Sequence, residues 1–152
     1  MSFTTLTWGV KASFRNYVEA SEGSITATDG ATQAEDGTFI FAAEPGGDLA
    51  IAADGSASGA MHFQGTVTFE AHGGMLKSTL KELAIEAGED GLVLTVLDGP
   101  MNKRRCAVAE LDLIEGGSGD RVTMSSKITM DGMYQIADNY PPGTELDPVR
   151  LS

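Results

Sequence analysis

The sequence is poor in cysteine, and Cys106 is the only one in 152 residues. A single cysteine excludes an intrachain disulfide and a metal site built from cysteine thiolates. Cys106 lies in a segment of alternating polarity, where it could be a small core residue or a nucleophile. The alternation favours the core residue.

Basic residues are also scarce. Ten lysines and arginines stand against 22 aspartates and glutamates, and the formal net charge is -12. This balance excludes nucleic acid and an anionic membrane surface as partners, because both require a basic patch. The run Lys103-Arg104-Arg105 is the exception. It is either a solvated turn or a clasp for a ligand carboxylate.

Long apolar runs are missing. No segment approaches the roughly 20 apolar residues that span a membrane. Residues 1–7 lack a charged region followed by an apolar run, so they do not form a secretory signal. The sequence therefore predicts a cytoplasmic protein with no membrane span, and it leaves a homodimer open.

Several catalytic and metal-binding signatures are missing too. The sequence has no GxGxxG, no Walker loop, no HExxH and no GxSxG elbow. His62 and His72 lie ten residues apart without further ligand spacing, which argues against zinc. Four Asp-Gly pairs predict turns, since they lack the spacing of a calcium loop: Asp29-Gly30, Asp36-Gly37, Asp54-Gly55 and Asp131-Gly132.

Short apolar segments separated by turns dominate what is present, together with 19 glycines. They predict strands over 25–28, 38–42, 49–52, 60–71, 91–98, 104–114 and 120–130. Residues 76–85 also favour strands, whereas the prolines of the tail bar a central strand there. The pattern predicts a mainly β fold, an antiparallel two-sheet sandwich or open barrel with one short N-terminal helix. It forms a single domain over 1–152.

The segment 6–18 has the only clear helical period. Thr7 is the expected cap, and one face carries four larger side chains: Val10, Phe14, Tyr17 and Val18. Tyr17 is then either an ordinary core tyrosine with a bonded hydroxyl or a functional phenol.

His72 follows the longest alternating run and precedes Gly73-Gly74. A double glycine predicts a bulge or bend. A bulge breaks the alternation, so the direction of the His72 side chain does not follow from parity.

Three segments, in order along the chain, resemble the HtaA-type haem-binding domain of haem-uptake proteins in Gram-positive bacteria. Residues 6–18 (LTWGVKASFRNYV) are similar to its opening motif. Residues 65–76 (GTVTFEAHGGML) are similar to its central motif, and residues 139–149 (NYPPGTELDPV) to its closing motif.

The resemblance implies two antiparallel sheets and a haem iron held by Tyr17. It also implies that His72 supports this ligand by a hydrogen bond, and that Tyr140 packs near the porphyrin. The family has an aromatic pair at that point, and here its first member is Asn139, which removes a stacking ring. Chemically, ferric iron would hold the phenol as a phenolate, and an imidazole would orient its oxygen.

A porphyrin also needs an apolar slot. The side chains available for one are otherwise core residues: Phe14, Phe63, Phe69, Met124, Met130 and Met133. We therefore expect haem binding for intracellular haem handling, with Tyr17 as the metal ligand and His72, Tyr140 and Phe14 around the cofactor.

Two alternatives remain open. Tyr17 and His72 could form an acid–base pair in a dry pocket. The chain would then be a cofactor-independent isomerase, lyase or cyclase acting on an apolar, aromatic or polycyclic molecule. The chain could also be a non-catalytic carrier of another small hydrophobic ligand. The sequence does not name the ligand.

Overall fold

The computed structural model describes residues 3–52, 54, 56–88, 91–97, 105–116, 121–136 and 140–152, without the side chains of 115 and 116. Its helices are α1 (Ala12–Ala20), the 3-10 turn η1 (His72–Gly74) and α2 (Met130–Gln135). Its strands are β1 (Thr5–Trp8), β2 (Ser24–Thr28), β3 (Ala31–Gln33), β4 (Phe39–Ala43), β5 (Ala50–Ile51), β6 (Ala57–Ser58), β7 (Ala60–Gln64), β8 (Thr66–Ala71), β9 (Leu76–Lys81), β10 (Ala84–Gly88), β11 (Gly91–Leu97), β12 (Arg105–Gly116), β13 (Val122–Ile128) and β14 (Glu145–Leu151).

Most strands form one antiparallel barrel. The order is β1-β14-β13-β12-β11-β10-β7-β4, and β4 pairs back to β1 and closes the ring. β3 extends β4 on the outside. The prediction of a mainly β, antiparallel fold with a short N-terminal helix is confirmed. Of the predicted two-sheet sandwich or open barrel, the structure has a barrel, and the β1–β4 pairing closes it.

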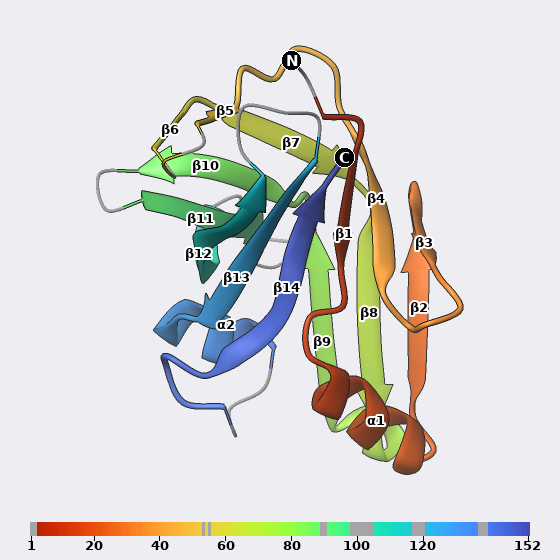
Figure 1. Ribbon diagram of the computed structural model, residues 1–152. Coiled ribbons are helices and arrows are strands. Elements are labelled where there is room, and N and C mark those ends of the chain that lie inside the picture. The colour runs from red at the N-terminus through yellow and green to blue at the C-terminus, as the bar shows by residue number, and fades with distance from the viewer. Residues whose placement is uncertain are drawn as a thin grey trace.

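A second sheet, β2-β8-β9, stands beside the barrel. Figure 1 shows α1 crossing the lower end of this sheet and α2 lying at the lower end of β12 and β13. The two helices therefore sit at the same end of the molecule. The two chain ends lie together at the opposite end, where the Thr4 amide donates to the Ser152 carbonyl over 2.6 Å.

The run 60–71, predicted as one strand, is divided between the two sheets. Gly65 has a φ of 130° and separates β7 from β8. A Cβ there would lie 2.5 Å from the Ala31 Cβ, so only glycine fits this close approach. The side chains of Phe63 and Val67, on the two sides of the break, are both buried.

The predicted helix 6–18 was wrong in its first half. Leu6 and Trp8 point into the barrel from β1, so Thr7 lies in a strand and caps nothing. The alternation of Leu6, Trp8 and Val10 competes with the helical period, and pairing with β4 and β14 decides for the strand. The helix begins only at Ala12.

The prediction that the prolines of the tail bar a central strand was wrong. β14 contains Pro148 and lies between β1 and β13. Its register to β13 shifts at this point, with Leu146 opposite Ser126 and Val149 opposite Met124. The extra residue is a bulge, where a missing backbone N–H breaks no ladder bond.

Other differences are local. Residues 76–85 lie in strands as predicted. The strand predicted over 120–130 ends at Ile128, because α2 begins at Met130. The Met130 side chain is exposed. Asp131-Gly132 therefore lies in a helix and not in a turn. Asp29-Gly30 is a turn as predicted, with positive φ at both residues. No described helix is both long enough and apolar enough to span a membrane.

The few aromatic residues are concentrated in the core. The largest side chains with almost no exposed surface include Trp8, Phe14, Phe39, Phe41, Phe63 and Phe69. Cys106 is buried among them, as expected of a core residue. Of the residues considered for an apolar slot, Phe63, Phe69 and Met124 are therefore core residues.

Candidate functional site

Tyr17 and His72 meet although 55 positions separate them in the chain. The Tyr17 hydroxyl lies 2.6 Å from Nε2 of His72, within hydrogen-bond distance. The two rings are tilted by 58° with centroids 5.7 Å apart. The pairing that the sequence motifs suggested is present.

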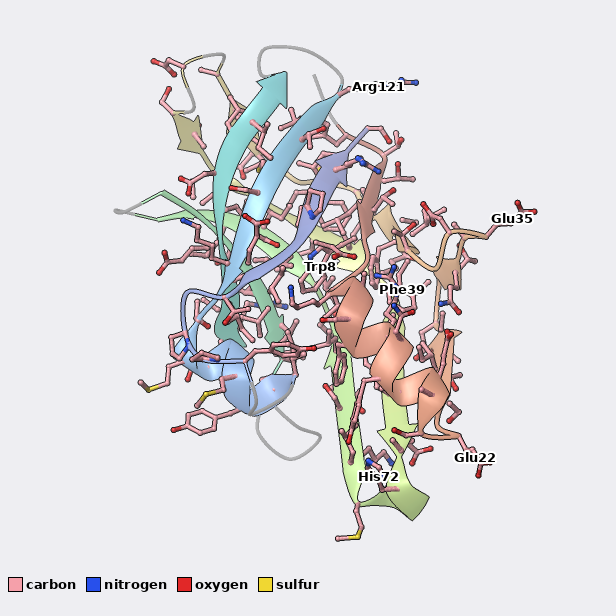
Figure 2. The ribbon with its side chains drawn as sticks, turned by 60° about the horizontal axis from the view of Figure 1, so that its bottom comes forward. Trp8, Glu22, Glu35, Phe39, His72 and Arg121 are labelled. Carbon is pink, nitrogen blue, oxygen red and sulfur yellow. The ribbon has the colours of Figure 1, made fainter. Side chains whose placement is uncertain are left out.

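Each side chain is aimed by its own local structure. Phe14 and Val18 are the buried residues of α1, which turns Tyr17 to the edge of the helix. His72 has a φ of 55°, and Gly73 and Gly74 also have positive φ, so three consecutive residues at the tip of the β8–β9 hairpin have left-handed φ values. Histidine tolerates this region better than most residues. Figure 2 shows His72 at this tip, at the end of the molecule opposite Arg121.

The pair is exposed. Tyr17 keeps 47% of its surface, and His72 is exposed as well. Tyr17 is thus not a core tyrosine, and the described residues do not enclose the pair in the dry internal pocket that the acid–base alternative needs. A groove of about 550 Å³ runs beside His72, but it is lined by small and polar residues: Ser21, Glu22, Gly23, Ser24, Glu70, Ala71, His72, Gly73 and Gly74.

Tyr140 continues the site along α1. Its hydroxyl lies 3.0 Å from the Ser13 hydroxyl, one helical turn before Tyr17. Phe14 lies behind it, with an edge-on ring contact of 6.3 Å to Tyr140 and a second contact of 4.9 Å to Phe69. Phe14 is 1% exposed. Phe14 therefore supports Tyr140 from beneath, and its contact with the cofactor stays a prediction.

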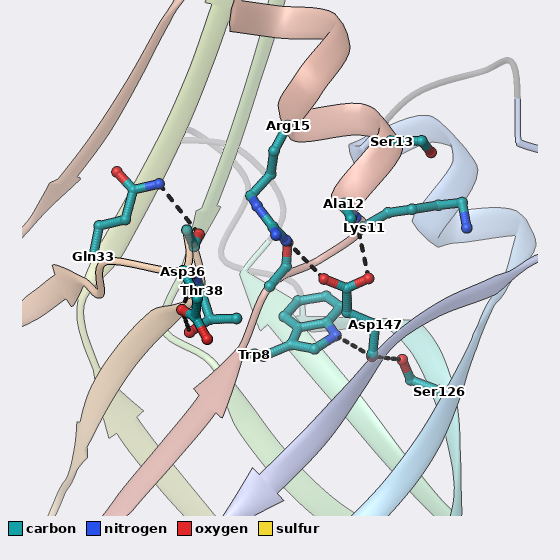
Figure 3. Close-up of polar contacts among 12 residues, drawn as sticks. Trp8, Lys11, Ala12, Ser13, Arg15, Gln33, Asp36, Thr38, Ser126 and Asp147 are labelled. Carbon is teal, nitrogen blue, oxygen red and sulfur yellow. Dashed lines mark hydrogen bonds and ion pairs between the residues drawn. The ribbon is translucent and has the colours of Figure 1, made fainter.

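Asp147 fastens α1 to the barrel, a role that the sequence reading missed. Its carboxylate accepts from the Ala12 amide (3.1 Å) and from Arg15 Nη1 (2.7 Å). Its backbone carbonyl accepts from Trp8 Nε1 (3.0 Å) and from the Ser126 hydroxyl (2.6 Å). Figure 3 shows these contacts converging from α1, β1 and β13.

The Asp147 contacts join the opening and closing motifs. A Cβ on Gly9 would lie 2.3 Å from both Arg15 Nη1 and Asp147 Oδ2, which explains the glycine before the helix. The signal in the sequence was the pair of motifs itself, since residues 6–18 and 139–149 each hold one half of the ion pair.

Other predicted residues lie elsewhere or outside the described residues. Asn139, Lys103 and Arg104 are among the latter. Arg105 donates to the Thr95 hydroxyl (3.0 Å), and the carboxylate clasp stays a prediction. Among the described residues no group of three or more histidine, cysteine or acidic side chains could hold a metal ion.

The family model described as Htaa matches residues 4–152. The chain belongs to the HtaA family. The resemblance seen in the three motifs is thus confirmed.

Solved structures of HtaA are similar along the whole chain. The C-terminal domain of HtaA from Corynebacterium glutamicum is 29% identical, with a TM-score of 0.72 over 98% of this chain and 95% of that chain. The N-terminal domain of the same protein is 25% identical, with a TM-score of 0.79 over 99% and 97%.

A more distant structure shares the fold. The haem-binding protein HtaB from C. glutamicum is 18% identical, with a TM-score of 0.73 over 98% of this chain and 91% of that chain. No curated protein sequence matches this chain.

Proposed function

We propose that this chain binds haem, with the Tyr17 oxygen as the axial ligand of ferric iron and His72 as its hydrogen-bond partner. The 2.6 Å contact between the Tyr17 hydroxyl and His72 Nε2 carries the proposal. Family membership supports it, and the structurally similar HtaB is itself described as haem-binding.

The residues present fit a ferric porphyrin. When bound, haem supplies a Lewis-acidic iron with an open axial position. A phenol next to an imidazole is a suitable donor, because the imidazole can accept or orient its proton and fix its oxygen. Tyr140 is half-buried and bonds to Ser13, one helical turn before Tyr17 on α1. It adds an aromatic face for the porphyrin ring.

The exposure of the pair favours haem over the acid–base alternative. Proton transfer by a tyrosine and a histidine needs a site closed to water, and Tyr17 is 47% exposed. A large, flat, apolar ligand supplies its own cover when it lies on an open surface. The same exposure leaves a carrier of another flat hydrophobic ligand as the second candidate.

Titration of the purified protein with hemin tests the proposal. We expect a Soret band of the tyrosinate-ligated ferric type at one equivalent. Tyr17→Phe should abolish that spectrum, because it removes the oxygen and keeps the ring. Tyr134→Phe is the matched control, since Tyr134 is a 71% exposed tyrosine on α2. If both variants take up hemin with the wild-type spectrum, Tyr17 is not the ligand.

An intracellular role in haem handling is part of this proposal, but the cytoplasmic location stays a prediction. Fractionation of the native cells, followed by detection with an antibody, tests it directly. The homodimer also stays a prediction. A domain-swapped dimer has been seen for a variant of the C-terminal domain of HtaA, which is 30% identical.

A further inference from the structure

Lys11 immediately precedes α1, the helix that carries Tyr17. Its Nζ lies 5.8 Å from the centroid of the Tyr140 ring and donates to the Glu145 backbone carbonyl over 2.7 Å. Among the described side chains, ion pairs join Arg15 to Asp147 and Lys77 to Glu70. Lys11 takes part in neither pair.

The Lys11 ammonium therefore has N–H groups beyond the one that it donates to Glu145. An ammonium has three N–H groups, and the Glu145 carbonyl takes one of them. Figure 3 shows the Lys11 side chain running away from the Asp147 carboxylate. An anion placed against the Tyr140 side of α1 would meet this cation.

Contacts at the start of α1 link the cation to the phenol, because Lys11 lies over the Tyr140 ring and Tyr140 reaches Ser13. Tyr140 bonds to Ser13, and Ser13 and Tyr17 are four residues apart on the same helix face. Six residues separate Lys11 from Tyr17, which corresponds to about 9 Å along a helix axis. A porphyrin has its metal at the centre and its carboxylates at the rim, so one flat molecule could reach both Lys11 and Tyr17.

We propose that Lys11 binds a rim carboxylate of the porphyrin and thereby fixes the rotation of the ring over Tyr17 and Tyr140. This inference rests on the proposed haem function. The contact would be a charge-assisted N–H···O bond, partly shielded from water by the Tyr140 ring. Lys11 is then a specificity residue, which favours porphyrins with free carboxylates.

The test compares hemin with hemin dimethyl ester, which lacks the free carboxylates. We expect Lys11→Met to weaken hemin binding about tenfold, as for one lost hydrogen bond to a charged group, and to leave binding of the ester unchanged. Lys11→Arg should restore most of the preference. Lys77→Met is the matched control, because Lys77 is a 61% exposed lysine on β9 that alternates away from the buried face of Ser78.

The outcomes separate the two proposals. An equal loss for hemin and ester in Lys11→Met would show that Lys11 acts only by holding Tyr140 or the Glu145 strand, and unchanged hemin binding would show that it has no role. Either result overturns the Lys11 proposal while the Tyr17-dependent Soret band stands. If wild-type protein takes up no hemin, the proposed function fails first and this inference with it.

Discussion

Two polar clusters on α1 differ in what surrounds them. The cluster at Asp147 is well packed, with Arg15 only 12% exposed and Ser126 fully buried. The cluster at Tyr17 and His72 is open, and its members come from a helix edge and a left-handed turn. The first holds the helix in place, whereas the second is left exposed at the surface. Interactions that are satisfied inside the fold stabilise it, and those left at the surface are available for binding.

The largest effect is expected from Asp147→Ala, which tests whether the buried cluster holds α1 in place. It removes the partner of Arg15 and of the Ala12 amide. A mostly buried arginine without its partner should lower the free energy of unfolding by about 3 kcal/mol. Thermal unfolding should show a melting temperature lower by roughly 6–12 °C. A change below 1 kcal/mol would mean that α1 is held by its apolar face alone.

Ser126→Ala tests the hydrogen bond to the backbone carbonyl of Asp147. The Ser126 hydroxyl is buried and donates to the Asp147 carbonyl, which keeps its bond from Trp8. We expect a loss of about 1 kcal/mol, a single neutral hydrogen bond. Denaturant unfolding with an unchanged m-value measures it. Because α1 is not touched, hemin binding should stay at the wild-type level.

Substitutions at His72 test the exposed cluster of Tyr17 and His72. Removal of an exposed hydrogen bond should hardly change stability, but the φ of 55° penalises any residue with a Cβ. We therefore expect His72→Gly to be about 1 kcal/mol more stable than His72→Ala, in chemical denaturation of both. Both variants should show a shifted Soret band with hemin. Equal stabilities would contradict the assigned turn conformation.

The smallest effect concerns two exposed turns, and the one at Asp36 lies beside Arg15. The Thr38 hydroxyl, followed by its amide, lowers the pKa of Asp36, and Ser56 does the same for the pKa of Asp54. A lowered carboxyl pKa adds stability that is present above the ordinary pKa and is lost as the pH falls through the lowered one. Thr38→Val should raise the pKa of Asp36 toward its ordinary value in an NMR titration and leave that of Asp54 unchanged. Ser56→Ala should do the reverse.

Much of the site could be predicted because its residues lie in motifs with their own local signals. The double glycine predicted a bend at His72, and the motif resemblance paired His72 with Tyr17. The exposure of Tyr17 could not be predicted, because helical period alone places it beside Val18 on the inner face. The rotation of α1 depends on where the helix starts, and Asp147, 135 residues after Ala12, determines that start.

The fold shows the same division. Alternation predicted most strands. Pro148 in a central strand could not be foreseen, since a bulge is a property of two paired strands and not of one.

The sequence by itself determined the mainly β character, the formal net charge of -12 and the chemical pair of a phenol and an imidazole. These follow from residue type and short-range period, which act without the rest of the chain. Only the tertiary structure decided that the barrel closes through β1 and β4, that Asp147 anchors the helix and that Tyr17 faces outward. Each of these depends on contacts between segments far apart in the chain, and their packing selects one arrangement among those that the local pattern allows.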